Sequence, residues 1–141
     1  MSLQYGRSQA AALIDGEDYE AAVTAATEAI AREPANSEHW FERATALAWL
    51  ERYEAACADF EKTKVLDVVT QVVEEDALDD GYFSSLLGAA RATDVAAGCA
   101  LLQRYATVWP DGRHVQDAQE WQERLRGERK SHFVKERLAS E

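Results

Sequence analysis

The stretch DYEAA at residues 18–22 returns as RYEAA at residues 52–56. Tyr19 therefore corresponds to Tyr53, which lies 34 positions later. A fixed period between about 20 and 50 residues is typical of proteins built from stacked structural units. Such proteins usually work by presenting a surface, so the repeat bears on function as well as on fold.

The composition favours a folded, all-helical chain. The 141 residues are 47% hydrophobic and include four Trp, but only seven Gly and two Pro. Ala, Glu, Leu and Arg are abundant, and all four are strong helix formers. A chain of this length can bury one core, so we expect a single domain over residues 1–141.

Apolar residues recur at steps of three and four, which predicts helices. The expected ranges are 3–15, 18–33, 37–50, 53–70, 80–92, 94–108 and 113–137. Pro34 ends the second of these helices, Ser37 is expected to cap the third, and Thr93-Asp94 the sixth.

The two periods share an order of small and aromatic residues. The second holds Trp40, Ala44, Leu47, Tyr53, Ala56 and Phe60, and the first holds Ala10, Leu13, Tyr19, Ala22, Ala26, Ala29 and Pro34. This order resembles the tetratricopeptide repeat (TPR). The resemblance implies an all-α fold in which antiparallel helix pairs stack as a short right-handed solenoid of about seven helices. Arg43 departs from the pattern, since a large apolar residue is usual there, and Val68 replaces the closing Pro, which favours a longer fourth helix.

A weaker third copy appears after an insertion of eight residues. Gly98 and Pro110 follow Ala22 and Pro34 by 76 positions, which is two periods plus eight. Tyr82-Phe83 follows Trp40-Phe41 by 42, and so requires the same insertion. We therefore expect repeats over about 3–36, 37–70 and 79–112, and a C-terminal capping helix over about 113–137. The insertion, over about 67–80, is acidic and either lengthens the fourth helix or forms a loop.

In the TPR family, the first helix of each pair lines a concave groove that binds partners. Carried over to this chain, the resemblance implies apolar contacts at Phe41, Thr45, Trp49 and Phe83, acidic flanks at Glu38, Glu42 and Asp80, and Arg7 at the opposite end. The alternative is that the aromatic residues among these pack against the neighbouring helix pair as part of the core.

The charge of the chain favours a basic or apolar partner. The net charge is −11, and residues 1–112 hold 8 Lys and Arg against 20 Asp and Glu. An acidic surface repels phosphate backbones, so we expect no nucleic acid partner. The same surface attracts basic proteins and peptides.

No pattern in the sequence points to chemistry. Cys57 and Cys99 lie 42 positions apart among Ala residues, which is typical of buried free thiols in a reducing cytoplasm. His39, His114 and His132 are scattered and lack the spacing of metal ligands or of a catalytic group. No Gly-rich phosphate loop and no apolar run long enough to span a membrane is present. We expect no catalytic, metal or cofactor site, no membrane contact, and a cytoplasmic location.

The sequence is compatible with three functions. The first is a non-enzymatic interaction module that binds a protein or peptide in an acid-flanked apolar groove, as a monomer or weak homodimer. The second is an acidic immunity-type inhibitor that neutralises a basic toxin or enzyme. The third is a self-assembling structural protein that uses Trp121, Phe133 and Leu138.

Overall fold

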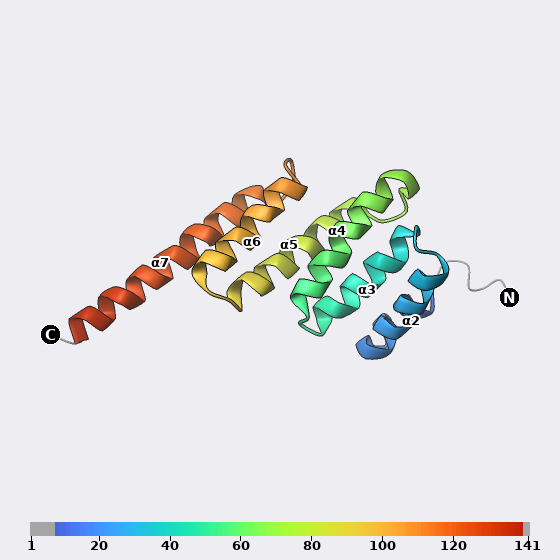
Figure 1. Ribbon diagram of the computed structural model, residues 1–141, viewed down its shortest axis with the longest axis horizontal. Helices are drawn as coiled ribbons and strands as arrows, with labels where there is room; N and C mark the ends of the chain where they lie inside the picture. The colour runs from blue at the N-terminus through green and yellow to red at the C-terminus, as the bar shows by residue number, and fades with distance from the viewer. Residues whose placement is uncertain (1–7, 140–141) are drawn as a thin grey trace. The chain divides into compact units, whose positions relative to one another are not determined.

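The computed structural model describes residues 8–139, with side chains described through residue 127, and this part of the chain is all-helical (Figure 1). Its seven helices are α1 (Gln9–Asp15), α2 (Tyr19–Arg32), α3 (Ser37–Trp49), α4 (Tyr53–Thr70), α5 (Glu75–Arg91), α6 (Val95–Val108) and α7 (Val115–Ala139). The predicted all-α class is confirmed. Helix α1 begins after Ser8, whose hydroxyl accepts the amide of Ala11 at 2.9 Å.

The chain divides into two compact units, one ending at Ser85 and one beginning at Leu86, inside α5. In the first unit, α1 packs on α2 and α3, α2 packs on α3, and α3 packs on α4. In the second unit, α6 packs on α7. Within each unit, the packed pairs are mostly helices that follow one another in the sequence, as in a helical solenoid.

The turn between α1 and α2 has the same backbone geometry as the turn between α3 and α4. Glu17 (φ 61°) and Glu51 (φ 60°), 34 positions apart, both adopt the left-handed conformation. In both turns, the backbone amide that follows this Glu donates a hydrogen bond of 2.9 Å to the carbonyl five positions before it. This Schellman geometry satisfies carbonyl groups at the end of a helix. The 34-residue period therefore holds in the backbone as well as in the sequence.

Helix α6 repeats the boundaries of α2 at the predicted displacement of 76. Asp18 caps α2 and Asp94 caps α6, and each side chain accepts the amide three residues later. At the C-terminal ends of the two helices, the amides of Glu33 and Trp109 each donate a hydrogen bond of 2.8 Å to the carbonyl four residues before them. The third copy thus shares its local geometry with the first.

The eight inserted residues lengthen two helices by about one turn each. Helix α4 continues four residues beyond Leu66, the position that corresponds to the end of α2. Helix α5 begins four residues before Asp79, the position that corresponds to the start of α3. The insertion expected over 67–80 is therefore mostly helical, with a loop at 71–74, and the expectation that α5 begins at 80 was wrong.

The start of α3 differs from the prediction. Asn36, and not Ser37, is the N-cap, and its side chain accepts the Glu38 amide at 3.0 Å. Ser37 is fully buried and donates to Asp67 at 2.7 Å. Asp67 also accepts the amide of Val72 at 3.0 Å, so it ties the start of α3 to the end of α4. Burial opposes ionisation of Asp67, but these hydrogen bonds outweigh it and lower its pKa.

Arg43, which departs from the repeat pattern, is paired with a buried acid. Its Nε donates to Asp59 Oδ2 at 2.7 Å and its Nη2 donates to Oδ1 at 3.0 Å. Asp59 is 5% exposed, and the hydrogen bonds to it raise the pKa of Arg43. The guanidinium also lies 5.1 Å from the Trp40 ring centroid. A two-point ion pair between α3 and α4 thus takes the place of an apolar contact.

Candidate functional site

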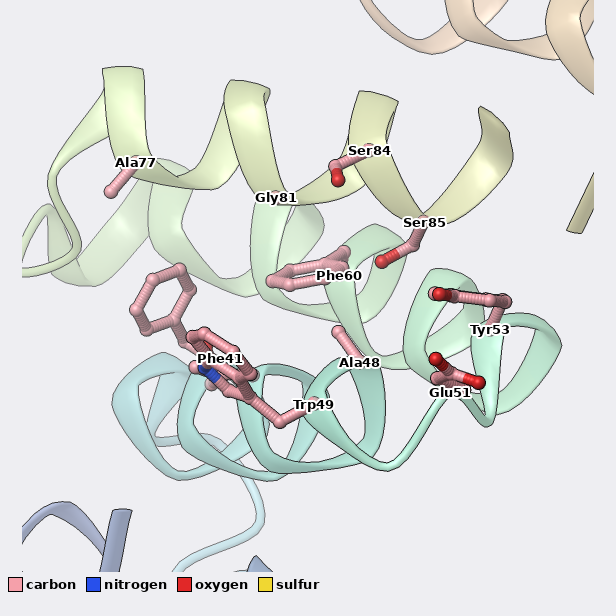
Figure 2. Close-up of a pocket in the computed structure, with 11 residues that line it drawn as sticks. Phe41, Ala48, Trp49, Glu51, Tyr53, Phe60, Ala77, Gly81, Ser84 and Ser85 are labelled. Carbon is pink, nitrogen blue, oxygen red and sulfur yellow. The ribbon is translucent and has the colours of Figure 1, made fainter. Parts of the chain in front are cut away.

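A groove of about 470 Å³ lies in the first unit between α3, α4 and the beginning of α5 (Figure 2). Helix α3 contributes Phe41, Thr45, Ala48 and Trp49, the following turn and α4 contribute Glu51, Tyr53 and Phe60, and α5 contributes Ala77, Gly81, Ser84 and Ser85. We call this set of eleven residues the groove. Figure 2 shows the rings of Phe41 and Trp49 at one end, and Glu51, Tyr53 and Ser85 at the other.

The apolar end of the groove is built from aromatic pairs. Trp49 is 63% exposed, yet its ring stacks on Tyr19 of α2 with centroids 5.5 Å apart and planes 6° apart. Phe41 meets Phe60 edge-on, with centroids 5.9 Å apart. Each pairing restricts a ring that faces the groove, so the apolar end is preorganised.

Gly81 allows α5 to pack closely on the ring of Phe60 at the base of the groove. Phe60 of α4 is 2% exposed, and its ring lies directly beneath Gly81 of α5. A Cβ at position 81 would lie 2.8 Å from Cζ of Phe60, closer than side-chain packing permits. Gly81 therefore allows this close contact, and a larger residue would force the ring or the helix to shift.

The polar end of the groove contains a buried hydroxyl without a partner. Ser85 is 1% exposed, and among the described residues its Oγ has no hydrogen-bond partner. Helical Thr residues in this chain instead donate to the carbonyl four positions earlier, as Thr24, Thr27, Thr45, Thr63 and Thr70 show. Ser85 does not make this bond, and Figure 2 shows its oxygen directed into the groove. A buried polar group that lacks a partner is energetically costly and calls for an explanation.

The structure brings together three of the eight residues that the sequence assigned to partner binding. Phe41, Thr45 and Trp49 line the groove. Phe83 does not line it and is only 8% exposed, so its ring belongs to the core. Glu38 and Asp80 are exposed on α3 and α5 but lie outside the groove lining. Arg7 falls outside the described residues.

Glu42 is not the exposed acidic flank that was predicted. It is 6% exposed, and its Oε2 accepts the hydroxyl of Ser8 at 2.7 Å. Its Oε1 lies 3.8 Å from Nδ1 of His39, whose Nε2 contacts Glu33 at 2.8 Å. Burial raises the pKa of Glu42, more than the Ser8 hydrogen bond lowers it. Glu42 is thus a structural carboxyl between the N-cap of α1 and α3.

The sequence did not identify the α5 side of the groove. The sequence assigned Asp80 and Phe83 to the groove, but Ala77, Gly81 and Ser84 line it. Gly81 and Ser84 each follow one of the predicted residues by one position. One residue rotates a helix face by about 100°. The available signal was small side chains at steps of three and four in α5, which marks a close approach to another helix.

A second apolar surface lies outside the groove. Val65, Val68 and Val69 at the lengthened end of α4, and Val72 in the loop after it, are 59–86% exposed. The spacing of three and four residues places Val65, Val68 and Val69 on one side of the helix. Helical spacing alone does not distinguish such a face from a buried one.

In the second unit, Trp121 is flanked by two guanidinium groups. The Cζ atoms of Arg91 and Arg124 lie 5.3 and 4.6 Å from its ring centroid. Trp121 thus has cation–π partners within its own unit. The side chains of Phe133 and Leu138, the other residues of the predicted self-assembly surface, lie outside the described residues.

The described residues bring together few groups suited to catalysis or metal binding. The groove contains the hydroxyls of Thr45, Tyr53, Ser84 and Ser85, but neither His nor Lys nor Cys lines it. Cys57 and Cys99 are buried free thiols, as predicted. No cluster of three His, Cys, Asp or Glu able to hold a metal occurs in the described part. None of the described helices combines the length and apolarity needed to span a bilayer.

Comparison with protein-family models finds no match for this chain, and comparison with curated protein sequences finds none either.

Proposed function

We propose that this chain is a non-enzymatic interaction module that binds a protein or peptide partner in the groove. The observation that carries the proposal is Trp49, which is 63% exposed but held flat against Tyr19 at the groove edge. A large aromatic ring is costly to expose and effective as a binding anchor once it is immobilised. The resemblance to the TPR family supports the same use of helix α3.

The residues that line the groove are of the kinds found in binding sites. Its apolar walls come from Phe41, Ala48, Trp49 and Ala77, and its hydroxyls gather mainly on the α4 and α5 side. Mostly apolar walls with a few convergent polar groups are typical of binding sites. The groove lining contains hydroxyl groups and one carboxylate but no His, Lys or Cys, and this set suits hydrogen bonding to a bound partner.

The partner is basic, apolar or both. Glu51 is the charged member of the groove lining, and the chain carries a net charge of −11. Opposite charge steers association and improves specificity. Two buried free thiols favour a reducing cytoplasm as the compartment.

Calorimetric titration with a partner recovered from the native lysate tests this function. Phe41→Ala and Trp49→Ala are each expected to weaken binding at least about tenfold. Val69→Ala is the matched control, because Val69 is 86% exposed and lies outside the groove. Equal affinity of all three variants, each with unchanged helicity, would refute the proposal.

An immunity-type inhibitor is the second candidate. Glu74, Glu75, Asp76 and Asp80 are exposed at the start of α5 and present a local excess of negative charge. An acidic inhibitor of a basic enzyme associates rapidly, and its association rate falls steeply with salt. Stopped-flow association between low and high salt separates this candidate from a groove-dominated module, whose affinity depends on apolar contact.

Self-assembly is the third candidate. Light scattering over a range of protein concentrations measures it directly, and a monomer at every concentration would eliminate it.

A further inference from the structure

We propose that the groove accepts an arginine side chain of its partner, with the guanidinium held at the polar end by Ser85, Tyr53 and Glu51. The inference rests on the proposed binding function and specifies the chemistry of the guest. The observation that carries it is the Ser85 hydroxyl, buried and unpartnered within the described chain, at the end of the groove that also holds a carboxylate.

The two ends of the groove differ in chemistry. Phe41 and Trp49 form the apolar end, whereas Glu51, Tyr53 and Ser85 supply oxygen atoms at the other (Figure 2). A guest that satisfies both ends has an extended apolar stem and a polar tip. Arginine and lysine have this form, since their methylene stems lie along apolar surface while the charged head reaches polar groups.

The charge at the polar end selects a cation. Glu51 is a carboxylate, and the groove lining contains no Lys, Arg or His that would neutralise it. Glu51 also occupies the left-handed backbone conformation (φ 60°), within a Schellman turn that fixes its position beside the groove. A cationic guest is therefore favoured at this end over an anionic or a neutral one.

The number of acceptors selects arginine over lysine. Ser85 Oγ, the Tyr53 hydroxyl and the Glu51 carboxylate are separate oxygen groups on α5, α4 and the α3–α4 turn. A guanidinium presents five N–H donors in a fixed plane, whereas an ammonium is a single compact centre. One guanidinium can donate to several of these oxygens at once and provide the partner that the Ser85 hydroxyl lacks.

NMR titration of the isotopically labelled full chain tests the inference. The probe is a capped pentapeptide with a central arginine between two leucines, and its control replaces arginine by the uncharged isostere citrulline. The arginine peptide is expected to shift the amide signals of the groove residues and to bind at least about tenfold more tightly than the control. Absence of binding, or equal affinity for the two peptides, would overturn the inference.

Two pairs of variants locate the contact. Ser85→Ala is expected to weaken binding of the arginine peptide about tenfold while leaving thermal stability equal or higher, because it removes an unsatisfied buried hydroxyl. Thr24→Ala, which removes an exposed hydroxyl outside the groove, serves as its control. Glu51→Gln is expected to weaken binding and to reduce its salt dependence, whereas Glu54→Gln, outside the groove, leaves both unchanged. Unchanged affinity in Ser85→Ala would overturn the assignment.

The aromatic variants distinguish the two proposals. If Phe41→Ala and Trp49→Ala abolish binding of the recovered partner while citrulline replaces arginine without loss, the groove function stands and the arginine inference is wrong. If neither aromatic variant affects the partner, the groove function itself is wrong.

Discussion

The indole of Trp49 lies flat against the phenol ring of Tyr19, with ring centroids 5.5 Å apart and planes inclined by 6°. Tyr19 begins α2 and Trp49 ends α3, so the contact joins the repeated tyrosine of the first helix pair to the groove-forming helix of the second. The same stretch that reveals the period thus supports the ring that we assign to partner binding.

A double-mutant cycle between Tyr19 and Trp49 measures this support. Single changes to Ala and the double change are each unfolded by urea, with helicity followed by circular dichroism. We expect a coupling free energy of about 0.5–1.5 kcal/mol, as for other stacked aromatic pairs. Additive losses would show that the rings do not interact in solution.

Phe83 and Phe41 are expected to respond differently to truncation. Phe83 is 8% exposed, so Phe83→Ala removes a core side chain and costs about 3–5 kcal/mol of unfolding free energy. Phe41 is half-buried in the groove wall, and Phe41→Ala costs roughly 1–2 kcal/mol. Chemical denaturation of both variants measures the difference, and a larger loss in Phe41→Ala would contradict these positions.

Gly81→Ala is expected to destabilise the chain by about 1–3 kcal/mol, because the added methyl overlaps the Phe60 ring. The matched test introduces the same change into a Phe60→Leu background, where the smaller side chain leaves room. The penalty there should be clearly smaller. An equal penalty in both backgrounds would mean that a contact other than the Phe60 ring controls position 81, because helix propensity alone favours Ala over Gly.

Glu42→Gln is expected to stabilise the chain at neutral pH. Burial raises the pKa of Glu42 in the folded state, so the ionised carboxylate destabilises the fold above that pKa. The stabilisation should fade as the pH falls through the raised pKa of Glu42 and be absent below the ordinary value of 4.5, where Glu42 is protonated in both the folded and unfolded states. Thermal melting from pH 4 to pH 8 measures this trend, and Glu54→Gln, an exposed site on α4, is the control. A destabilisation that grows with pH would contradict the assignment.

Removal of one partner of the Arg43–Asp59 pair is expected to destabilise the fold more than replacement of both partners. Asp59→Ala leaves a largely buried guanidinium without its acid and should cost about 3 kcal/mol. The double variant R43M/D59L replaces both charged groups with apolar side chains of similar size and should recover much of that loss. Chemical denaturation compares the single and double variants, and a double variant as unstable as the single one would contradict this description of the pair.

Most of the fold could be predicted from the sequence. Pro34 and the Asp caps mark the helix boundaries, and the 34-residue spacing appears again in the turns at Glu17 and Glu51. Both signals are local, since a cap or a turn depends on neighbouring residues. The length of the insertion was also predictable, because two anchors in the third copy required the same eight residues.

The face that α5 presents could not be predicted. The position of the insertion decides where α5 begins, and the Gly81–Phe60 contact decides which side approaches α4. The large Phe83 was the expected groove residue, but small side chains at Ala77 and Gly81 allow the closer approach. The roles of Ser85 and Glu42 depend on contacts across helices, which single-sequence periodicity does not contain.

Site-specific photocrosslinking in the native host shows whether a partner binds in the groove. A benzophenone amino acid is placed at Ser84, an exposed position in the groove, and in a separate chain at Val69, an exposed position outside it. We expect a discrete protein adduct from position 84 that disappears when Phe41→Ala is added, and none from position 69. An adduct from position 69 with none from position 84 would contradict partner binding in the groove.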